Sequence, residues 1–279
     1  MPLPVAALDH AVVNALDRMD EAVACYRRLG FRLTERGYHT LGSINHLAVF
    51  RTNYLELIGY ERGARQVRTD ILRFPVGLNA LVLAAEDADA TYRGLQAAQV
   101  AAEAPIAFAR PVAIGGATQE ARFRTVRLPP DSLPSGRVYF CQHLTRELVW
   151  RAEWQDHPNG AQDIVRALVA ARDPRRGASI FAAMFDAAAL REIAGGVALD
   201  LGNMHVAFVT PDRVAATLGA AAPAAAGRAD YMAALTLRTA SLDAAAAAIA
   251  PEAGARREPG RLIVPAAAAM DTALEFVAS

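Results

Sequence analysis

The order of structural elements predicted for residues 8–60 constrains the fold of this chain more than any other feature. The apolar run at 8–15 is typical of a strand, and apolar residues then recur at helical spacing up to Gly30, where glycine favours a helix end. Three strand-like runs separated by turn residues follow, at 31–36, 44–50 and 53–60. The segment is therefore predicted to form one βαβββ module.

The same order of elements recurs along the chain. Residues 78–100 align with residues 9–31, and this alignment places Asn79 on His10. The first strands of two further modules are predicted at 163–174 and 229–241, and a helical stretch is predicted around 175–194. The sequence therefore predicts an α+β fold in which four βαβββ modules form two pairs, each pair a cupped sheet shaped like half a barrel.

The polar segment 151–162 is the best candidate for a boundary between the two pairs. The predicted domains are 1–150, with the first two modules, and 163–279, with a degenerate second pair, joined by a linker at 151–162. In the second pair, Arg166 and Ala234 occupy the positions that match His10. This pair is interpreted as scaffold or as the surface of a homodimer.

Composition excludes several functional classes. With 279 residues, of which 53% are apolar, the chain is able to form a sizeable core, and its net charge of +0 favours neither nucleic acid nor an anionic membrane as a partner. All 29 basic residues are arginine, so a catalytic or phosphate-binding lysine is excluded. The sequence shows no signal peptide, membrane-spanning run, Ser-His-Asp elbow, phosphate loop, dinucleotide fingerprint or paired-cysteine motif. A cytoplasmic protein with a small-molecule partner is expected.

His10 in the first predicted strand and Glu56 in the last are the leading candidates for a functional site. A charged group inside a strand of a packed sheet is costly unless a partner or a metal ion compensates it. His10 either contacts a ligand or donates a hydrogen bond to a backbone carbonyl. Glu56 lies on the face opposite Leu55 and Leu57, and that face is either the site or solvent.

Three further polar residues are candidates for contacts with a substrate. His39 and Asn45 lie in a loop and at a strand edge, where they either bind a substrate oxygen or act in acid–base chemistry. Asn45 has the alternative role of satisfying backbone groups of a turn. Arg110 either receives a substrate carboxylate or is one of many surface arginines.

This layout resembles the vicinal oxygen chelate superfamily, which includes glyoxalase I, extradiol dioxygenases and fosfomycin-resistance proteins. The superfamily pattern of a first-strand histidine, a following aspartate and a helix that ends near Leu-Gly-Phe is matched by His10, Asp17 and residues 29–31. A closer similarity, to the glyoxalase-like domain family, is carried by 37–45, 54–57, Arg110 and the turn at 157–161.

The resemblance implies a divalent ion, such as Zn²⁺, Mn²⁺, Ni²⁺ or Fe²⁺, held by the first and last strands of the first two modules. His10 and Glu56 occupy these positions in the first module, and His143 is the candidate from the last strand of the second. Asn79 occupies the remaining position, where the family usually has histidine or glutamine, and it is assigned to substrate binding.

The expected function is that of a metal-assisted lyase or isomerase, or of a dioxygenase, acting on a small oxygen-rich molecule. Glu56 and His39 are the predicted catalytic residues, and the predicted substrate-binding residues are Asn45, Asn79 and Arg110. The alternative is a metal-free protein of the same fold that binds or sequesters a small molecule. Asn79 and the missing ligand set of the second pair favour this alternative.

Overall fold

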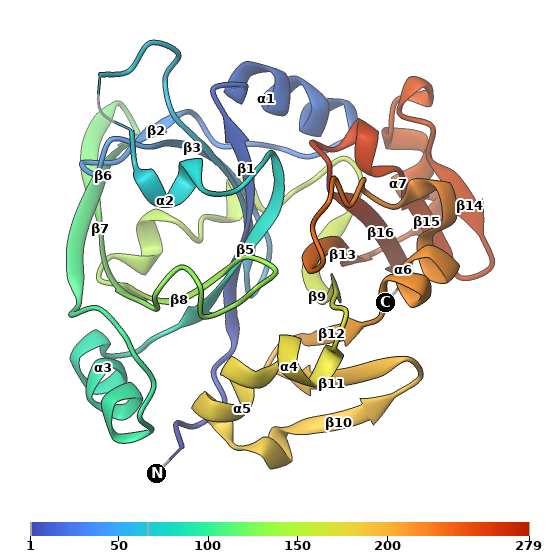
Figure 1. Cartoon of the computed structure of the whole chain (residues 1–279). Coiled ribbons are helices and arrows are strands. Elements are labelled where there is room, and N and C mark those ends of the chain that lie inside the picture. Colours follow the sequence, from blue (N-terminus) through green and yellow to red (C-terminus); the bar gives the residue numbers. More distant parts are fainter. Residues whose placement is uncertain (1, 66, 279) are drawn as a thin grey trace.

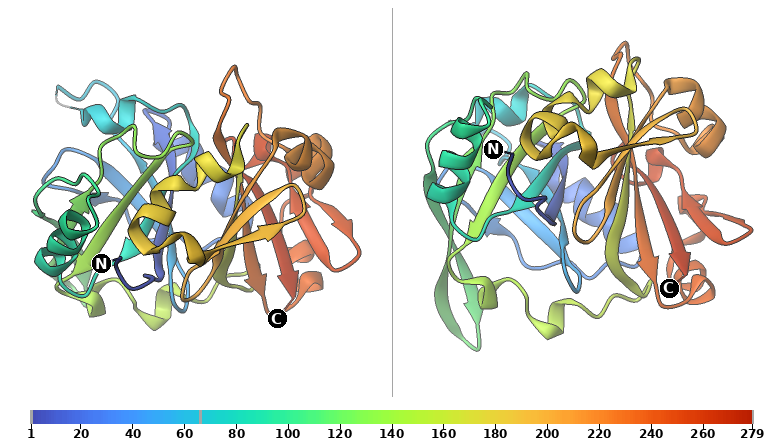
Figure 2. Two further views of the ribbon diagram at one scale, coloured as in Figure 1. Left: turned by 60° about the horizontal axis from the view of Figure 1, so that its bottom comes forward. Right: turned by 90° about the horizontal axis from the view of Figure 1, so that it is seen from below.

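Two eight-stranded β-sheets with the same strand order make up the computed structural model, which describes residues 2–65 and 67–278. The N-terminal half forms the first sheet (blue to green in Figure 1) and the C-terminal half forms the second (yellow to red). The two sheets lie side by side in all three views of Figures 1 and 2. This architecture confirms the α+β fold of repeated βαβββ modules predicted from the sequence.

The helices and strands have the following bounds. The first sheet contains β1 (Leu8–Leu16), β2 (Gly37–Tyr38), β3 (Ile44–Val49), β4 (Tyr54–Gly59), β5 (Gly77–Ala84), β6 (Ile106–Ile114), β7 (Ala117–Arg127) and β8 (Arg137–His143). The second contains β9 (Ala161–Ala170), β10 (Leu190–Ile193), β11 (Gly196–Asp200), β12 (His205–Val209), β13 (Tyr231–Thr239), β14 (Arg256–Glu258), β15 (Arg261–Val264) and β16 (Ala273–Ala278). The α-helices are α1 (Met19–Arg28), α2 (Thr69–Leu72), α3 (Ala88–Ala97), α4 (Pro174–Gly177), α5 (Ser179–Phe185), α6 (Pro211–Leu218) and α7 (Leu242–Ala248). Within the described residues, no helix is long and apolar enough to cross a membrane.

Each sheet is built around a central antiparallel pair of strands. In the first sheet this pair is β1 and β5, and each of them also pairs in parallel with the last strand of its own module, β4 or β8. The second sheet repeats the arrangement with β9 and β13 at its centre. We call the concave side of the first sheet, which carries the buried cluster of Val12, Leu47, Val82 and Phe123, the cup.

The two edges of the first sheet nearly meet. The backbone N–H of Thr40, just after β2, donates to the carbonyl of Ala109 in β6 over 3.1 Å, and the N–H of Ala109 donates to Thr40 Oγ1 over 3.3 Å. The first sheet is thus almost a barrel, whereas β10 and β14 at the edges of the second sheet lie far apart (Figure 1). Enclosure of this kind removes the interior of the cup from bulk water.

Two local predictions are wrong. Residues 31–36 form no strand. The backbone N–H of Leu47 donates to the hydroxyl of Thr34, where a β-ladder would have a backbone carbonyl as the acceptor. The helix expected around 175–194 divides into α4 and α5 and then gives way to β10. It ends at Asp186, whose positive φ of 83° is incompatible with a continuing helix.

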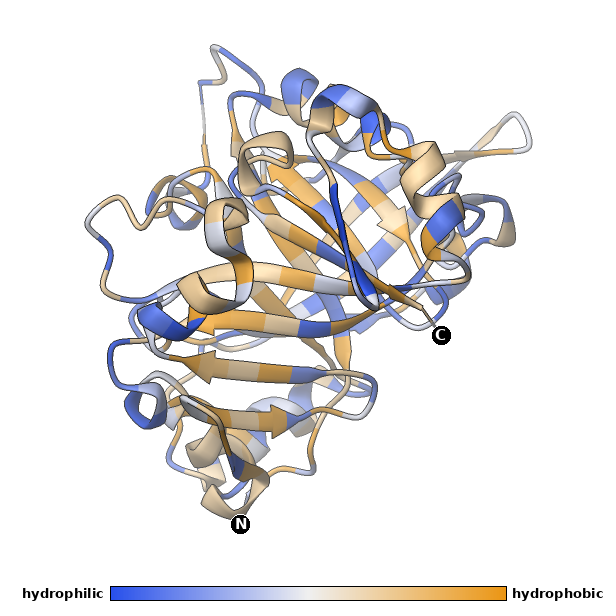
Figure 3. Cartoon of the chain, turned by 90° about the vertical axis from the view of Figure 1, so that its right-hand side faces the viewer, coloured by the Kyte–Doolittle hydropathy of each residue, from blue (hydrophilic) through white to orange (hydrophobic). Residues whose placement is uncertain are grey.

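The two halves share one hydrophobic core, which lies on the outer side of the cup. Phe31 and Phe276, from opposite halves, have ring centroids 6.1 Å apart within it. Apolar residues dominate most of the long strands in Figure 3, whereas much of the hydrophilic colour lies in loops. Residues 151–160 of the predicted linker lie in the connection between β8 and β9, and its last two residues begin β9. His157 of this segment packs against Phe50 and accepts the N–H of Arg32. The division into separate domains stays a prediction.

Asn53 joins the halves through two buried hydrogen bonds, and its removal is a test of their coupling. Its Nδ2 donates to the carbonyl of Ile164 over 3.0 Å, and the N–H of Ile164 donates to its Oδ1 over 2.9 Å. We expect Asn53→Ala to lower the free energy of unfolding by about 2–4 kcal/mol, because two buried backbone groups lose their partners. Denaturant unfolding measures this change. The exposed Gln96→Ala is the control, and an equally small effect of both variants contradicts the prediction.

Candidate active site

A β-bulge in β1 shapes the site. In the ladder between β1 and β5, Leu8 pairs with Leu83 and His10 pairs with Val82, so that Asp9 is an extra residue without a cross-strand partner. A bulge interrupts the alternation of side chains and redirects the inserted residue. As a result two consecutive side chains, those of Asp9 and His10, are buried next to each other and bonded.

The bulge fixes the orientation of the His10 imidazole. Its Nδ1 donates to Asp9 Oδ1 over 2.6 Å, which directs Nε2 toward Glu56, whose Oε2 lies 3.6 Å away. The ring also stacks on Tyr54 with a centroid distance of 4.3 Å and an interplanar angle of 12°. A histidine held by a carboxylate at one nitrogen presents the other nitrogen in a defined direction.

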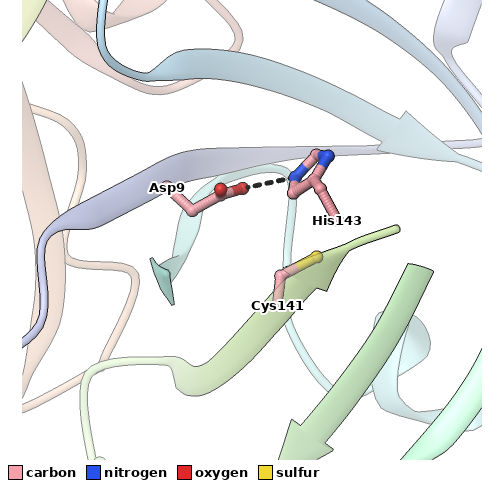
Figure 4. A group of neighbouring side chains, drawn as sticks. All are labelled: Asp9, Cys141 and His143. Atoms are coloured by element: carbon pink, nitrogen blue, oxygen red, sulfur yellow. Dashed lines mark hydrogen bonds and ion pairs between the residues drawn. The ribbon is translucent and has the colours of Figure 1, made fainter. Parts of the chain in front are cut away.

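Asp9 lies between two imidazoles, those of His10 and His143. His143 Nε2 donates to Asp9 Oδ1 over 3.1 Å (Figure 4). Burial opposes ionisation of Asp9, but the two imidazoles outweigh it and hold the pKa of this carboxyl well below its ordinary value of 3.8. Cys141 completes a group in which one potential ligand atom from each of Asp9, Cys141 and His143 lies within 4.8 Å of the others. Burial, followed by the charge of Asp9, raises the pKa of the Cys141 thiol, so the sulfur is protonated at neutral pH.

A chain of hydrogen bonds extends from the other side of Glu56. Asn45 Nδ2 donates to Glu56 Oε1 over 2.7 Å and lies 3.3 Å from His39 Nε2. His39 Nδ1 in turn lies 2.9 Å from Ser43 Oγ. This network assigns the His39 proton to Nδ1, because Nε2 faces the amide nitrogen of Asn45, which can only donate.

The charge states of Glu56 and His39 follow from their surroundings. Burial opposes ionisation of Glu56, but the imidazoles of His10 and His39 and the amide of Asn45 outweigh it and lower its pKa, so the carboxylate is ionised. Burial lowers the pKa of His39 to about 4, and the positive charge of Arg110 adds to this effect against the opposing charge of Glu56. His39 is therefore neutral at pH 7.

The structure brings five of the predicted site residues to a single cavity inside the cup. The lining includes His10, His39, Asn45, Glu56 and Arg110. Arg110 is only 3% exposed, and its Nη2 has no hydrogen-bond partner within the described residues. The cavity has a volume of about 30 Å³, which is room for a water molecule or two. A molecule larger than water therefore fits only if side chains or the loops that cover the cup are displaced.

Asn79 lies outside this cavity. The β1–β5 ladder skips Asn79 in β5 just as it skips Asp9 in β1, so the register makes Ala80, not Asn79, the counterpart of His10. The sequence alignment is off by one here because the stretch from Ala80 to the start of α3 at Ala88 is one residue shorter than the stretch from His10 to the start of α1 at Met19. The Oδ1 of Asn79 accepts from Arg137 Nη2 over 2.9 Å.

The last strand of the second module supplies Tyr139 at the position of Glu56. Glu56 pairs with Val12 of β1, and Tyr139 pairs with the corresponding Val82 of β5. Tyr139 lines the cavity, whereas His143 lies farther along β8, outside the lining, and is hydrogen-bonded to Asp9 rather than to His10. The ligand positions of the second module thus carry neither an imidazole nor a carboxylate.

In the second sheet the equivalent positions are filled by an internal ion pair. The β9–β13 ladder puts Arg166 at the position of His10, and the β13–β16 ladder puts Glu275 at the position of Tyr139. Glu275 accepts hydrogen bonds from Thr236 and Arg261, each over 2.7 Å, and also pairs with Arg166. Its carboxylate is fully bonded.

Sequence reasoning missed Asp9, Arg68 and Arg127. Strict alternation along the first strand directs Asp9 away from the cup, and only the bulge corrects this. Arg68 comes from an irregular segment just before α2. Arg127 had a detectable signal, because it follows Phe123 and Thr125 at the two-residue spacing of one strand face, and all three line the cavity.

Comparison with known proteins places the chain by sequence and by fold. Residues 8–185 match the sequence model of a family described as glyoxalase-like domain. A search of curated proteins gives no match.

Solved structures that are similar to the whole chain share its fold at low sequence identity. A hypothetical protein from Staphylococcus aureus has a TM-score of 0.67 at 15% identity, with 99% of this chain and 100% of that chain covered. A mutant of 4-hydroxymandelate synthase from Streptomyces coelicolor has a TM-score of 0.57 at 12% identity, covering 99% and 93%. A fusion of a xylose isomerase-like TIM barrel with a 4-hydroxyphenylpyruvate dioxygenase gives 0.56 at 14%, covering 100% of this chain and 50% of the fusion. These identities support a common fold alone.

The lowered pKa of His39 predicts a specific dependence of stability on pH. In the unfolded chain His39 takes up a proton near pH 6.5, whereas in the folded protein it does so only at about 4. Between these values the unfolded state binds more protons, so the free energy of unfolding falls as the pH falls from 6.5 to 4. We expect His39→Gln to lose less stability across this range than the wild type. Denaturant unfolding measures the free energy of unfolding at each pH. If it falls by the same amount in both proteins between pH 6.5 and 4, the assignment is contradicted.

Proposed function

Because the chain belongs to the glyoxalase-like domain family, we propose that the cup is the active site of an enzyme acting on a small oxygen-rich anion. The observation that carries the proposal is the guanidinium of Arg110, which is buried and unpaired in the same cavity as Glu56 and His39. A buried cation without a partner is costly, and its planar donors match a carboxylate. The substrate is therefore proposed to supply the missing anion.

His10 and Glu56 fit two ligand positions of the divalent ion that the fold family implies. Their Nε2 and Oε2 atoms are 3.6 Å apart, close to the separation of roughly 3–3.5 Å between two atoms that bind one ion at about 2.1 Å each. The bond from His10 to Asp9 is the outer contact that metal-binding histidines have. Nitrogen and oxygen ligands suit Zn²⁺, Mn²⁺, Ni²⁺ or Fe²⁺. A bound ion would polarise a substrate oxygen and stabilise the negative charge that develops on it.

Glu56 is the proposed general base. Its carboxylate is ionised, and its Oε1 accepts a hydrogen bond from Asn45. Oε2 accepts a proton from a bound molecule only when it does not hold an ion, so the two proposed roles of Glu56 alternate. His39, neutral at pH 7, orients Asn45 and is the proposed second acid–base group. Arg110 holds the anionic end of the substrate. Proton removal beside such a group begins lyase and isomerase reactions, and the dioxygenase named among the structural neighbours supports an oxidative reaction as the other candidate.

Metal-free binding of the same kind of molecule is the second candidate function. Ala80 and Tyr139 occupy the ligand positions of the second module and favour this candidate. Of the four strand positions at which the family holds an ion, only those of His10 and Glu56 then carry a ligand. In this function Arg110 binds the anion, and His10 and Glu56 hold no ion.

Metal analysis distinguishes the two candidates. We expect protein produced anaerobically with added metal to contain about one divalent ion per chain, and the His10→Ala variant to lose it, because that variant removes one of two ligands. His205→Ala, which removes an imidazole from the second sheet, is the control and keeps the ion. Elemental analysis of the purified proteins measures the content. An ion-free wild type contradicts metal-assisted chemistry and leaves the metal-free candidate.

Substitution of Arg110 tests its function separately from its structural role. We expect Arg110→Met to raise the free energy of unfolding by about 1–3 kcal/mol, because a buried unpaired charge is replaced by an apolar chain of similar length. The same variant is expected to lose binding of carboxylate ligands, measured by calorimetry. Arg122→Met, on the outward face of β7, changes neither quantity appreciably. A destabilised Arg110→Met protein that still binds carboxylates assigns Arg110 a structural role instead.

A further inference from the structure

A second cavity adjoins the first and extends the site toward the surface. It has a volume of about 200 Å³ and is lined in part by Asp70 and Arg137. Arg127 and Tyr139 line both cavities, so the two spaces meet at these side chains. The outer cavity thus adds room that the inner one lacks.

Arg127 is available to a ligand at this junction. It follows Phe123 and Thr125 on the inward face of β7, and it is half-buried. Its guanidinium has neither a hydrogen bond nor an ion pair within the described part of the chain. Burial lowers the pKa of Arg127, and the neighbouring charge of Arg68 adds to this effect. Arg127 is therefore, like Arg110, a cation without a bonded partner.

The protein's own carboxylates do not balance the arginines of the two cavities. Asp70 is already shared, because it accepts two bonds from Arg68, over 3.0 and 2.6 Å, and one from Arg137 over 2.8 Å. Arg110 and Arg127 add two more guanidinium groups. Among the described lining residues that are not exposed, the only other carboxylate is that of Glu56.

At the mouth of the outer cavity the charges are already paired or exposed to water. Arg73 is exposed and bonded to Asp131 over 2.8 Å, and Glu103 is exposed. These groups neither require a ligand nor neutralise the interior arginines, because water screens exposed charges. The unbalanced charge lies at Arg110 and Arg127.

We propose that the substrate is a dianion whose two acidic groups bind at Arg110 in the cup and at Arg127 where the two cavities meet. This inference rests on the proposed function and narrows its substrate class. Two guanidinium groups without protein partners, in one connected space, complement two separate anionic groups. A dicarboxylate and a phosphorylated carboxylate share this chemistry.

Calorimetric titration of the full chain with matched acids tests the proposal. The probes are malonate, succinate, glutarate and adipate, each beside the monocarboxylate of the same carbon number, together with 3-phosphoglycerate beside glycerate. We expect at least one dianion to bind about tenfold more tightly than its monoanion, which corresponds to one additional charge-assisted contact. The dicarboxylates and 3-phosphoglycerate are tested separately. The series with the larger preference for the dianion shows whether the second acidic group of the substrate is a carboxylate or a phosphate.

Variants of β7 locate the second binding position. Arg127→Gln is expected to abolish the preference for dianions and leave monoanion binding unchanged. Arg127→Lys retains the charge and part of the preference, and Arg122→Gln, on the outward face, retains all of it. Equal affinity for dianions and monoanions in the wild type, or a preference that survives Arg127→Gln, overturns the proposal. Arg110-dependent binding of monoanions then still supports the proposed function, whereas a wild type that binds none of the acids refutes both.

Discussion

The bulged antiparallel pair of β1 and β5 determines where the groups of the candidate site lie. One bulge brings Asp9 beside His10, and this contact orients the imidazole toward Glu56. The other displaces Asn79 from the ladder, and its side chain meets Arg137. Both irregularities belong to backbone pairing, so the positions of these side chains are set by the fold and not by a ligand. This is the preorganisation that a binding or catalytic site requires.

The repeated modules and the residues of the cavity were largely predictable, because periodicity and strand alternation report on which face a side chain lies. His10 and Glu56, far apart in sequence, come together as the βαβββ order requires. A bulge has no such signature: strict alternation along β1 directs Asp9 away from the cup, and an alignment without the bulged register puts Asn79 where Ala80 lies. The structure of irregular segments was equally unpredictable, because side-chain hydrogen bonds such as that of Thr34 do not affect the spacing of apolar residues in the sequence.

The same backbone framework appears twice in the chain, and the two copies differ in how far their buried polar groups are bonded. In the second sheet Glu275 receives bonds from several side chains, and the positions around it form a closed ion-pair network. In the first sheet Arg110 remains unpaired in a cavity. Closed networks stabilise a fold and leave nothing for a ligand to satisfy, whereas an open one carries a free-energy cost that a ligand removes.

Within the described residues, every buried side-chain nitrogen or oxygen without a hydrogen-bond partner belongs to the first 150 positions. Because the two halves share one core and one architecture, this difference does not come from the fold. Selection for stability alone acts equally on both halves and removes unpaired groups from each, since each such group costs free energy. The unpaired arginine and amide groups on which the proposed function rests therefore lie in the half that carries the cup, and the described residues of the second half have no counterpart to their free-energy cost.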